Sequence, residues 1–285
     1  MSFRALIVGG TSGIGYAIAC RVASSNPASS VTVVGRNKPA SFPHPNMEFN
    51  HLDASSMRSI KRYTDELKSS GSKLDLLVMS QGILTMQGRT ETSEGIDVKM
   101  ALHYYGKQLL IRELLPVLSD GGRVLIVLDG SSGNPAKLIW DDLDLKTHYG
   151  IKAAADHCVS MTDAMVQYWA KVQPDAPADS KKHFIHAFPG SVNTPIVKGI
   201  VPTYLQAPAG LLAKWTLTSP EKCAERMLDG AEDRVKEGTQ QGKFWANIDS
   251  KGNPVKDKAV WTDDQMEKIT KHTWEVIDAA LSVKG

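Results

Sequence analysis

The stretch that decides the fold is residues 4–15, which read RALIVGGTSGIG. A short apolar run leads into a glycine-rich turn, and helical spacing of apolar residues begins at Ile14. Glycines allow a tight turn and let backbone amides approach a phosphate without an obstructing Cβ. The first turn of a helix adds a partial positive charge that attracts anions. The stretch therefore predicts a strand, a dinucleotide phosphate-binding turn and a helix. The residues expected to form the binding surface of the turn are Gly9, Thr11, Ser12, Gly13, Ile14 and Gly15.

Outward from this turn, short apolar runs alternate with longer stretches that have helical spacing. The apolar runs are residues 5–8, 31–34, 74–79, 124–128 and 184–188, with a weaker one at 47–52. The helical stretches are residues 14–23, 57–68, 96–118 and 151–172. Strands that are apolar on both faces and alternate with helices are typical of a parallel sheet covered on both sides. The predicted fold class is α/β, an open doubly wound parallel sheet (a Rossmann fold) of six or seven strands.

No clear domain boundary interrupts the chain, so we expect a single nucleotide-binding domain over residues 1–285. Residues 37–46 contain three prolines and are expected to hold little or no helix. Ser219 followed by Pro220 is typical of a helix start, and residues 262–283 predict a helix with a polar face. We expect residues 196–216, which mix apolar residues with Pro and Gly, to form a substrate lid. An equal possibility is that some of them contact a membrane or another subunit. Residues 219–285 are expected to form a C-terminal extension.

Composition excludes several classes of protein. The 33 Lys and Arg residues nearly balance the 31 Asp and Glu residues, so the net charge of +2 offers no attraction for a nucleic-acid backbone. The three cysteines, Cys20, Cys158 and Cys223, are far apart and form no CxxC pair, so we expect neither a metal site nor a disulfide. No apolar stretch approaches the roughly 18–20 residues that a transmembrane helix needs. The first residues lack a signal-peptide pattern, and we therefore expect a cytoplasmic protein.

The end of the second predicted strand indicates which dinucleotide binds. An NAD site usually presents a carboxylate to the ribose 2′-hydroxyl about twenty residues beyond the last glycine. This chain has Arg36, Asn37 and Lys38 there, and none of them is acidic. Arg36 can stack on adenine and pair with a 2′-phosphate, which a carboxylate would repel. We therefore expect the cofactor to be NADP(H). The alternative is that Arg36 and Lys38 are solvated loop charges.

Four segments together resemble the short-chain dehydrogenase/reductase family. VGGTSGIG at residues 8–15 is similar to the family's TGxxxGxG, and LDA at 52–54 resembles its adenine-side Asp segment. MSQG at 79–82 stands where the family has Asn-Asn-Ala-Gly, and PGSVNT at 189–194 resembles its PGxVxT segment. The chain is identified as a member of this family from about residue 3 to residue 194, and weaker features resemble a fungal branch with an atypical active site. The resemblance implies further nucleotide contacts by Asp53, Ser80, Gln81, Gly82, Pro189, Gly190, Val192 and Thr194.

The resemblance also implies a catalytic Tyr and Lys, normally spaced YxxxK. In the family the Tyr passes a proton to the substrate, while the Lys lowers the pKa of the Tyr and binds the nicotinamide ribose. This chain reads HYGIK at residues 148–152, so Tyr149 and Lys152 are three residues apart and would still share one helix face. Alternatively His148 takes the Tyr position and donates the proton. Tyr149 is the preferred donor, and a third reading is that neither residue is catalytic.

The position of the family's catalytic Ser is occupied by Asp129, followed by Gly130, Ser131 and Ser132. An ionised Asp accepts hydrogen bonds but cannot donate one to a carbonyl or an alkoxide. Ser131 or Ser132 could supply the hydroxyl after a shift of the loop, or the substrate could be cationic, such as an imine reduced as its iminium. A third interpretation is that the chemistry has changed.

His103 stands where the family has an Asn that anchors a water in a proton relay. It could hold such a water, relay the proton directly, or be a core residue. The family commonly pairs two helices across subunits, and Leu109, Leu110, Leu114 and residues 161–169 could form a homo-oligomer in that way.

The expected function is an NADP(H)-dependent oxidoreductase of secondary metabolism that reduces a C=O or C=N bond of a hydrophobic small molecule. Two alternatives remain open. One is a scaffold repurposed for isomerisation, dehydration or cyclisation without redox chemistry, and the other is a non-catalytic nucleotide-binding protein.

Overall fold

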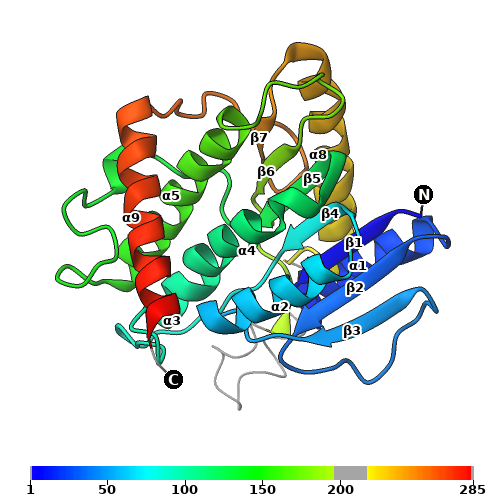
Figure 1. Cartoon of the computed structure of the whole chain (residues 1–285), viewed down its shortest axis with the longest axis horizontal. Coiled ribbons are helices and arrows are strands. Elements are labelled where there is room, and N and C mark those ends of the chain that lie inside the picture. Colours follow the sequence, from blue (N-terminus) through cyan, green and yellow to red (C-terminus); the bar gives the residue numbers. More distant parts are fainter. Residues whose placement is uncertain (1, 196–216, 284–285) are drawn as a thin grey trace.

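The computed structural model describes residues 2–195 and 217–283, and its centre is one seven-stranded parallel sheet (Figure 1). The strand order is β3-β2-β1-β4-β5-β6-β7, with every neighbouring pair parallel. The strands are β1 (Arg4–Val8), β2 (Ser30–Gly35), β3 (Met47–His51), β4 (Leu74–Met79), β5 (Leu118–Val127), β6 (His183–Ala187) and β7 (Trp245–Ile248). From β1 the sheet is extended on one side by β2 and β3, and on the other side by β4 to β7. Because the connections on the two sides run in opposite directions, a crevice is expected at the carboxyl ends of β1 and β4.

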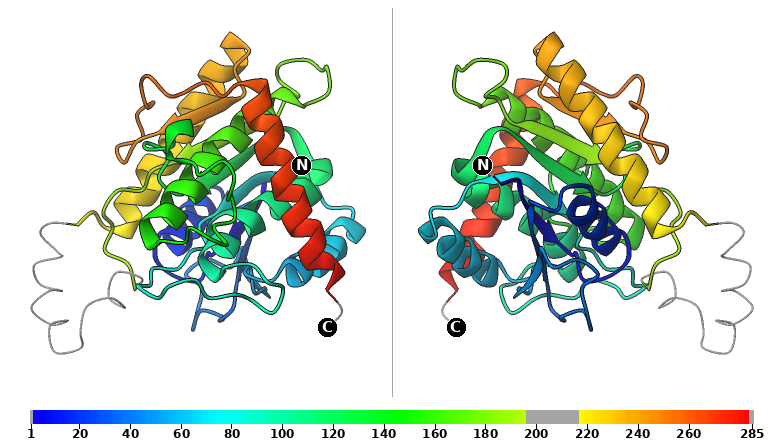
Figure 2. Two further views of the ribbon diagram at one scale, coloured as in Figure 1. Left: turned by 90° about the vertical axis from the view of Figure 1, so that its left-hand side faces the viewer. Right: turned by 90° about the vertical axis from the view of Figure 1, so that its right-hand side faces the viewer.

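Helices cover both faces of the sheet (Figure 2). The α-helices are α1 (Gly13–Ser25), α2 (Met57–Ser69), α3 (Val98–Met100), α4 (Gly106–Leu114), α5 (Ile151–Lys171), α8 (Pro220–Gln241) and α9 (Asp263–Ser282). Short helical turns are η1 (Ala101–Tyr105), η2 (Leu115–Val117) and η3 (Pro135–Lys137). Helices α1 and α8 share one apolar core with the sheet, while α2, α4, α5 and α9 share the other.

Successive residues of a strand pack into opposite cores, so both faces of the strand are apolar. In β1, Leu6 and Val8 pack toward α2, α4 and α5, whereas Ala5 and Ile7 pack toward α1 and α8. All four side chains are buried. The predicted doubly wound parallel sheet is thereby confirmed.

Two helix starts follow the local sequence as predicted. The Ser219 side chain accepts a hydrogen bond from the Lys222 amide, and Pro220 occupies the first helical position of α8. Thr262 and Gln265 form a reciprocal capping box at the start of α9. Residues 37–46 contain no helix, as their prolines indicate.

Two predictions about elements were incomplete. The stretch predicted as one helix at 96–118 is divided into α3, the π-helical turn η1, α4, η2 and the start of β5. Apolar periodicity did not reveal the π turn, because an inserted residue shifts the buried face without breaking the pattern over a few residues. Strand β7 has four residues and only two of them, Asn247 and Ile248, are buried, so it carries no strong apolar signal.

Helix α9 lies beside α5 and closes the outer side of the α2, α4 and α5 layer (Figure 1). Tyr104 and Thr273 share a 2.6 Å hydrogen bond, and the rings of Trp169 and Trp274 lie 5.8 Å apart. Leu109, Leu110 and Leu114, together with most of residues 161–169, are buried within this chain. The prediction that these side chains form a subunit interface is therefore wrong, because the chain's own core already buries them. No helix among the described residues is long and apolar enough to span a bilayer.

Candidate functional site

A groove of about 240 Å³ lies at the carboxyl ends of β1, β2 and β4. It brings together four segments that the sequence singled out, although Gly9 and Thr194 are 185 residues apart. Its lining residues include Gly9, Thr11, Ser12, Gly13, Ile14, Gly15, Arg36, Asp53, Ser80, Gln81, Gly82, Leu102 and Thr194. The predicted nucleotide-binding residues that do not line the groove are Asn37, Lys38, Lys152, Pro189, Gly190 and Val192.

The glycine turn is pressed against the neighbouring segments. Gly9 has a φ of +80°, and a Cβ there would overlap the amide of Gln81. A side chain at this position is therefore excluded twice, by the backbone conformation and by the space. A Cβ on Gly13 would lie 3.2 Å from Cγ2 of Thr194, so the turn also meets the segment that follows β6.

The first turn of α1 is open to an anion. Its N-cap residue, Ser12, has extended backbone angles but accepts no hydrogen bond from the helix amides. No acidic side chain lies in the first turn either. The amides at this end are therefore left to water or to a ligand, which is the arrangement that binds a phosphate.

Gln81 carries the clearest sign that the groove is built for a polar ligand. Its side chain is 7% exposed, and both amide atoms are buried without a hydrogen-bond partner among the described residues. Buried polar atoms almost always have partners, because an unmet one costs about 1–3 kcal/mol. A nucleotide in the groove would offer hydroxyl and phosphate oxygens to this amide, so the residues present fit the predicted cofactor.

Arg36 and Asp53 line the groove, and the sequence assigned both of them to the adenosine half of the nucleotide. Arg36 follows β2, is exposed, and forms no salt bridge within the described ranges. Asp53 is held by Ser55, whose amide and hydroxyl both donate to Oδ1 at 3.0 and 2.7 Å. The exposed cation predicted to meet a 2′-phosphate and the oriented carboxylate predicted to meet adenine therefore line the same groove, and both roles stay predictions.

Asp129 follows β5 at the same edge of the sheet, although it does not line the groove. Its Oδ1 accepts from the Ser131 amide at 3.1 Å and from the Ser131 hydroxyl at 2.5 Å, and its Oδ2 accepts from the Ser132 hydroxyl. Burial acts to raise the pKa of Asp129, but these hydrogen bonds and the nearby His186 outweigh it, so the pKa is lowered. The carboxyl is therefore ionised at neutral pH, and both serine hydroxyls are engaged by it.

The predicted acid–base residues are not assembled at the groove. Helix α5 begins at Ile151 after the N-cap residue Gly150, so Tyr149 lies outside the helix. The prediction that Tyr149 and Lys152 share a helix face is wrong for this reason. The Tyr149 hydroxyl is buried without a partner among the described residues, and the Lys99 ammonium lies 5.3 Å from its ring centre. The Lys152 side chain is 86% exposed and pairs with Asp156.

His148 is directed to a different partner. Its Nδ1 lies 3.0 Å from Oδ2 of Asp142, and 61% of its side chain is exposed. Asp142 also accepts from the backbone amides of residues 146–148, and although burial acts to raise the pKa of Asp142, these bonds lower it. His148 is therefore a surface histidine beside an ionised carboxylate, and its role as proton donor stays a prediction.

His103 supports the loop after β4. Its Nε2 lies 3.1 Å from the amide nitrogen of Ile83 and 2.8 Å from the carbonyl oxygen of the same residue. Burial, assisted by the charge of Lys107, lowers the pKa of His103 to about 4, so the ring is neutral at pH 7. The relay role stays a prediction, while the observed contact holds the backbone next to Gly82.

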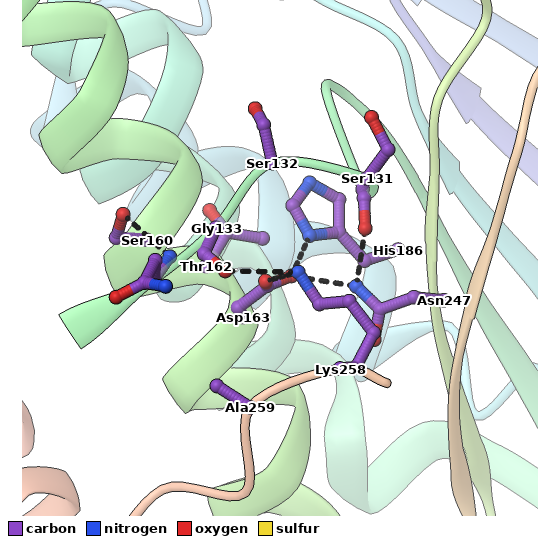
Figure 3. A network of polar contacts seen from close by, with 12 residues as sticks. Ser131, Ser132, Gly133, Ser160, Thr162, Asp163, His186, Asn247, Lys258 and Ala259 are labelled. Atoms are coloured by element: carbon purple, nitrogen blue, oxygen red, sulfur yellow. Dashed lines mark hydrogen bonds and ion pairs between the residues drawn. The ribbon is translucent and has the colours of Figure 1, made fainter. Parts of the chain in front are cut away.

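Sequence reasoning missed several polar residues behind the site. Lys107 of α4 is fully buried and donates to the carbonyl oxygen of Val127 at 2.9 Å. Asp163, His186 and Lys258 form a buried cluster with Asn247 (Figure 3). No local motif marks them, because they come from different elements. For Lys107 and Asp163, the sequence signal was a charged residue inside an otherwise apolar helix. Residues 196–216, predicted as a lid, lie outside the described residues.

Comparisons with known proteins agree with this geometry. Residues 4–137 match the family model of the short chain dehydrogenases. Oxidoreductase AN1596 of Emericella nidulans is 32% identical over 213 residues, which cover 70% of this chain and 62% of that protein. Oxidoreductase andH of Emericella variicolor is 30% identical over 69% of this chain and 60% of its own length. The chain thus spans about 60% of the length of the first curated relatives that it matches.

Solved structures show the same fold at low sequence identity. A short chain dehydrogenase family protein from Francisella tularensis has a TM-score of 0.63 at 17% identity, covering 88% of this chain and 98% of that one. A short chain dehydrogenase from Burkholderia cenocepacia, solved in complex with NADP, has a TM-score of 0.58 at 17% identity, covering 88% and 97%. From the matched model, the fungal relatives, the sheet order and the glycine turn, we conclude that this chain belongs to the short-chain dehydrogenase/reductase family.

Proposed function

We propose that this protein is an NADP(H)-dependent oxidoreductase that reduces a polar double bond of a hydrophobic small molecule. The observation that carries the proposal is the groove beside the glycine turn, which is lined by Arg36 and by Gln81, whose buried side-chain amide has no partner among the described residues. The names of the fungal relatives, which are oxidoreductases, and the NADP bound to the Burkholderia structure support it. When bound, NADPH supplies the hydride.

Each segment of the groove has a task in holding the nucleotide. The open amides of α1 would bind the pyrophosphate, and Arg36 would pair with the 2′-phosphate. Asp53, already oriented by Ser55, would accept from the adenine amine. Thr194 and the preceding residues after β6 would hold the nicotinamide end. We also propose that residues 1–285 form one nucleotide-binding domain.

The state of Asp129 favours an imine over a ketone as the substrate. An ionised carboxylate with both neighbouring hydroxyls engaged cannot donate a hydrogen bond to a carbonyl oxygen. It stabilises a cation, so an imine beside it would be held in its protonated iminium form. Hydride addition to the carbon of an iminium gives the amine directly, and no acid has to protonate the nitrogen in that step. This requirement suits a site in which Tyr149 and Lys152 do not converge on the groove.

The nucleotide part of the proposal is tested by calorimetry with NADPH and NADH. We expect tighter binding of NADPH, and we expect Arg36→Asp to weaken NADPH while sparing NADH. Arg62→Asp is the matched control, because Arg62 is an exposed arginine on α2 that does not line the groove. Equal affinities for the two nucleotides, or equal effects of the two variants, would exclude the assignment of Arg36.

The chemical part is tested by NADPH oxidation with a panel of cyclic imines and matched ketones. We expect turnover of imines by the wild type, and a shift toward ketones in Asp129→Ser. Turnover of ketones alone by the wild type would overturn the role of Asp129.

A second candidate function is nucleotide binding without hydride transfer. The observation that favours it is the exposed position of Lys152, which pairs with Asp156, so that no lysine lines the groove among the described residues. Tight binding of NADPH with no turnover of any panel member would favour this candidate.

A further inference from the structure

A buried cluster of four polar side chains lies directly behind the turn that carries Asp129. Asp163 of α5 is fully buried, and its carboxylate accepts from Nδ1 of His186 on β6 at 2.5 Å. It also accepts from Nδ2 of Asn247 on β7 at 2.6 Å, and from the ammonium of Lys258 in the segment between β7 and α9. Figure 3 shows the three donors converging on this one carboxylate.

Two of these donors also bind the backbone of the neighbouring turn, residues 129–133, which we call the Asp129 turn. Asn247 donates to the carbonyl oxygen of Gly130 at 2.8 Å, and Lys258 donates to that of Gly133 at 3.1 Å. The contact is close, because a Cβ on Gly133 would overlap the carboxylate of Asp163. The Asp129 turn is thus tied at two carbonyls to a charged group beneath it.

The charges in the cluster depend on one another. An ionised carboxylate without solvent contact needs a nearby cation and several donors to remain charged. Lys258 supplies the cation, and only 7% of its side chain is exposed. His186 donates from Nδ1, and Figure 3 shows the opposite edge of its ring, with Nε2, directed away from Asp163 toward the Asp129 turn. That Nε2 atom is buried without a partner among the described residues.

We propose that Asp163, Asn247 and Lys258 are positioning residues that clamp the Asp129 turn at the nicotinamide end of the site. The inference rests on the proposed function, since it assigns a role to the turn beside the bound cofactor. Lys258 matters most, because it lies on the C-terminal segment and couples that segment to the turn through Gly133 and Asp163. The clamp adds to the hydrogen bonds within the turn, in which Ser131 and Ser132 donate to Asp129.

Hydrogen exchange measured by mass spectrometry on the full chain tests the clamp without a substrate. In Lys258→Met we expect the amides of residues 129–133 to exchange at least about tenfold faster, because losing a hydrogen bond to a charged donor raises the population of the open turn by such a factor. Lys256→Met is the matched control, because Lys256 is exposed on the same segment. Peptides from β1 and α1 report whether the whole chain has loosened, and they should not change.

Lys258→Met leaves Asp163 without its cation, so the double variant Asp163→Asn with Lys258→Met is made as well. It removes both charges together and still deprives the Gly133 carbonyl of its donor. If the Asp129 turn exchanges at the wild-type rate in this double variant, the clamp does not exist.

NADPH serves as the probe of the positioning role. We expect Lys258→Met to change the fluorescence emission of bound NADPH, because this emission comes from the nicotinamide. NADPH affinity should stay within about threefold of the wild-type value, because the adenosine half is proposed to bind at Arg36 and Asp53, away from the Asp129 turn. Unchanged emission together with faster exchange would show that the turn does not serve the nicotinamide and would overturn the proposal. A wild type that binds no NADPH refutes the proposed function instead, whatever the exchange data show. Arg36→Asp provides the converse control, with weaker NADPH binding and an unchanged Asp129 turn.

Discussion

Replacing Lys107 by Met should change how stability depends on pH. Lys107 of α4 is fully buried, and the polar contact of its ammonium among the described residues is the carbonyl oxygen of Val127 at 2.9 Å. Burial lowers the pKa of Lys107 from 10.5 to about 7, and the nearby Cys158 offsets only a small part of this effect. Between about pH 7 and pH 10.5, the Lys107 side chain is therefore mostly neutral in the folded chain and mostly protonated in the unfolded chain.

The sign and size of the effect follow from this difference. The unfolded state binds more protons in that range, so the contribution of Lys107 to the free energy of unfolding rises with pH. Each tenfold change in proton affinity corresponds to about 1.4 kcal/mol, which makes the cost of burying Lys107 about 4 kcal/mol at pH 7 and about 2 kcal/mol at pH 9. Lys107→Met removes this cost but leaves the Val127 carbonyl without its donor, at about 1–3 kcal/mol.

The variant should therefore be at least as stable as the wild type at pH 7. The difference in unfolding free energy, variant minus wild type, should fall by about 2 kcal/mol between pH 7 and pH 9. Urea unfolding at pH 7, 8 and 9, followed by circular dichroism and tryptophan fluorescence together, measures the difference. Lys256→Met, at an exposed lysine, should differ from the wild type by a constant amount. A constant difference for Lys107→Met as well would refute the assignment of a neutral buried lysine.

Three further substitutions test the local arguments. Gly9→Ala should cost about 1–2 kcal/mol from its positive φ alone, and the overlap with Gln81 should also weaken NADPH binding in calorimetry; unchanged binding would contradict the packing described for the turn. Thr262→Ala removes the N-cap of α9 and should lower the free energy of unfolding by about 1 kcal/mol in urea, with no effect on NADPH affinity. Trp274→Ala should cost about 2–3 kcal/mol, because the ring packs on Trp169 but is only partly buried; a neutral result in thermal unfolding would show that α9 is not held there.

Parts of the site were readable from the sequence because their chemistry is local. The glycines at 9 and 13 adopt positive φ angles in a turn whose shape depends on adjacent residues. The absence of an acid after β2, with Arg36 in its place, is likewise a matter of a few neighbouring positions. A local signal was also overlooked: Lys152 and Asp156 are four residues apart, the spacing of an ion pair along a helix, and they form that pair.

Local sequence patterns were enough to predict the strand–turn–helix that opens the chain, the doubly wound sheet and the edge at which a nucleotide would bind, because apolar periodicity and turn chemistry act over a few residues. Which side chains meet at that edge depends on long-range packing. This packing places Tyr149 against the core, ties the Asp129 turn to Asn247 and Lys258, and brings Asp163 and Lys258 together across 95 residues. The reason is that the direction of a side chain, and the charge it carries when buried, depend on partners from other elements, which no spacing along one segment records.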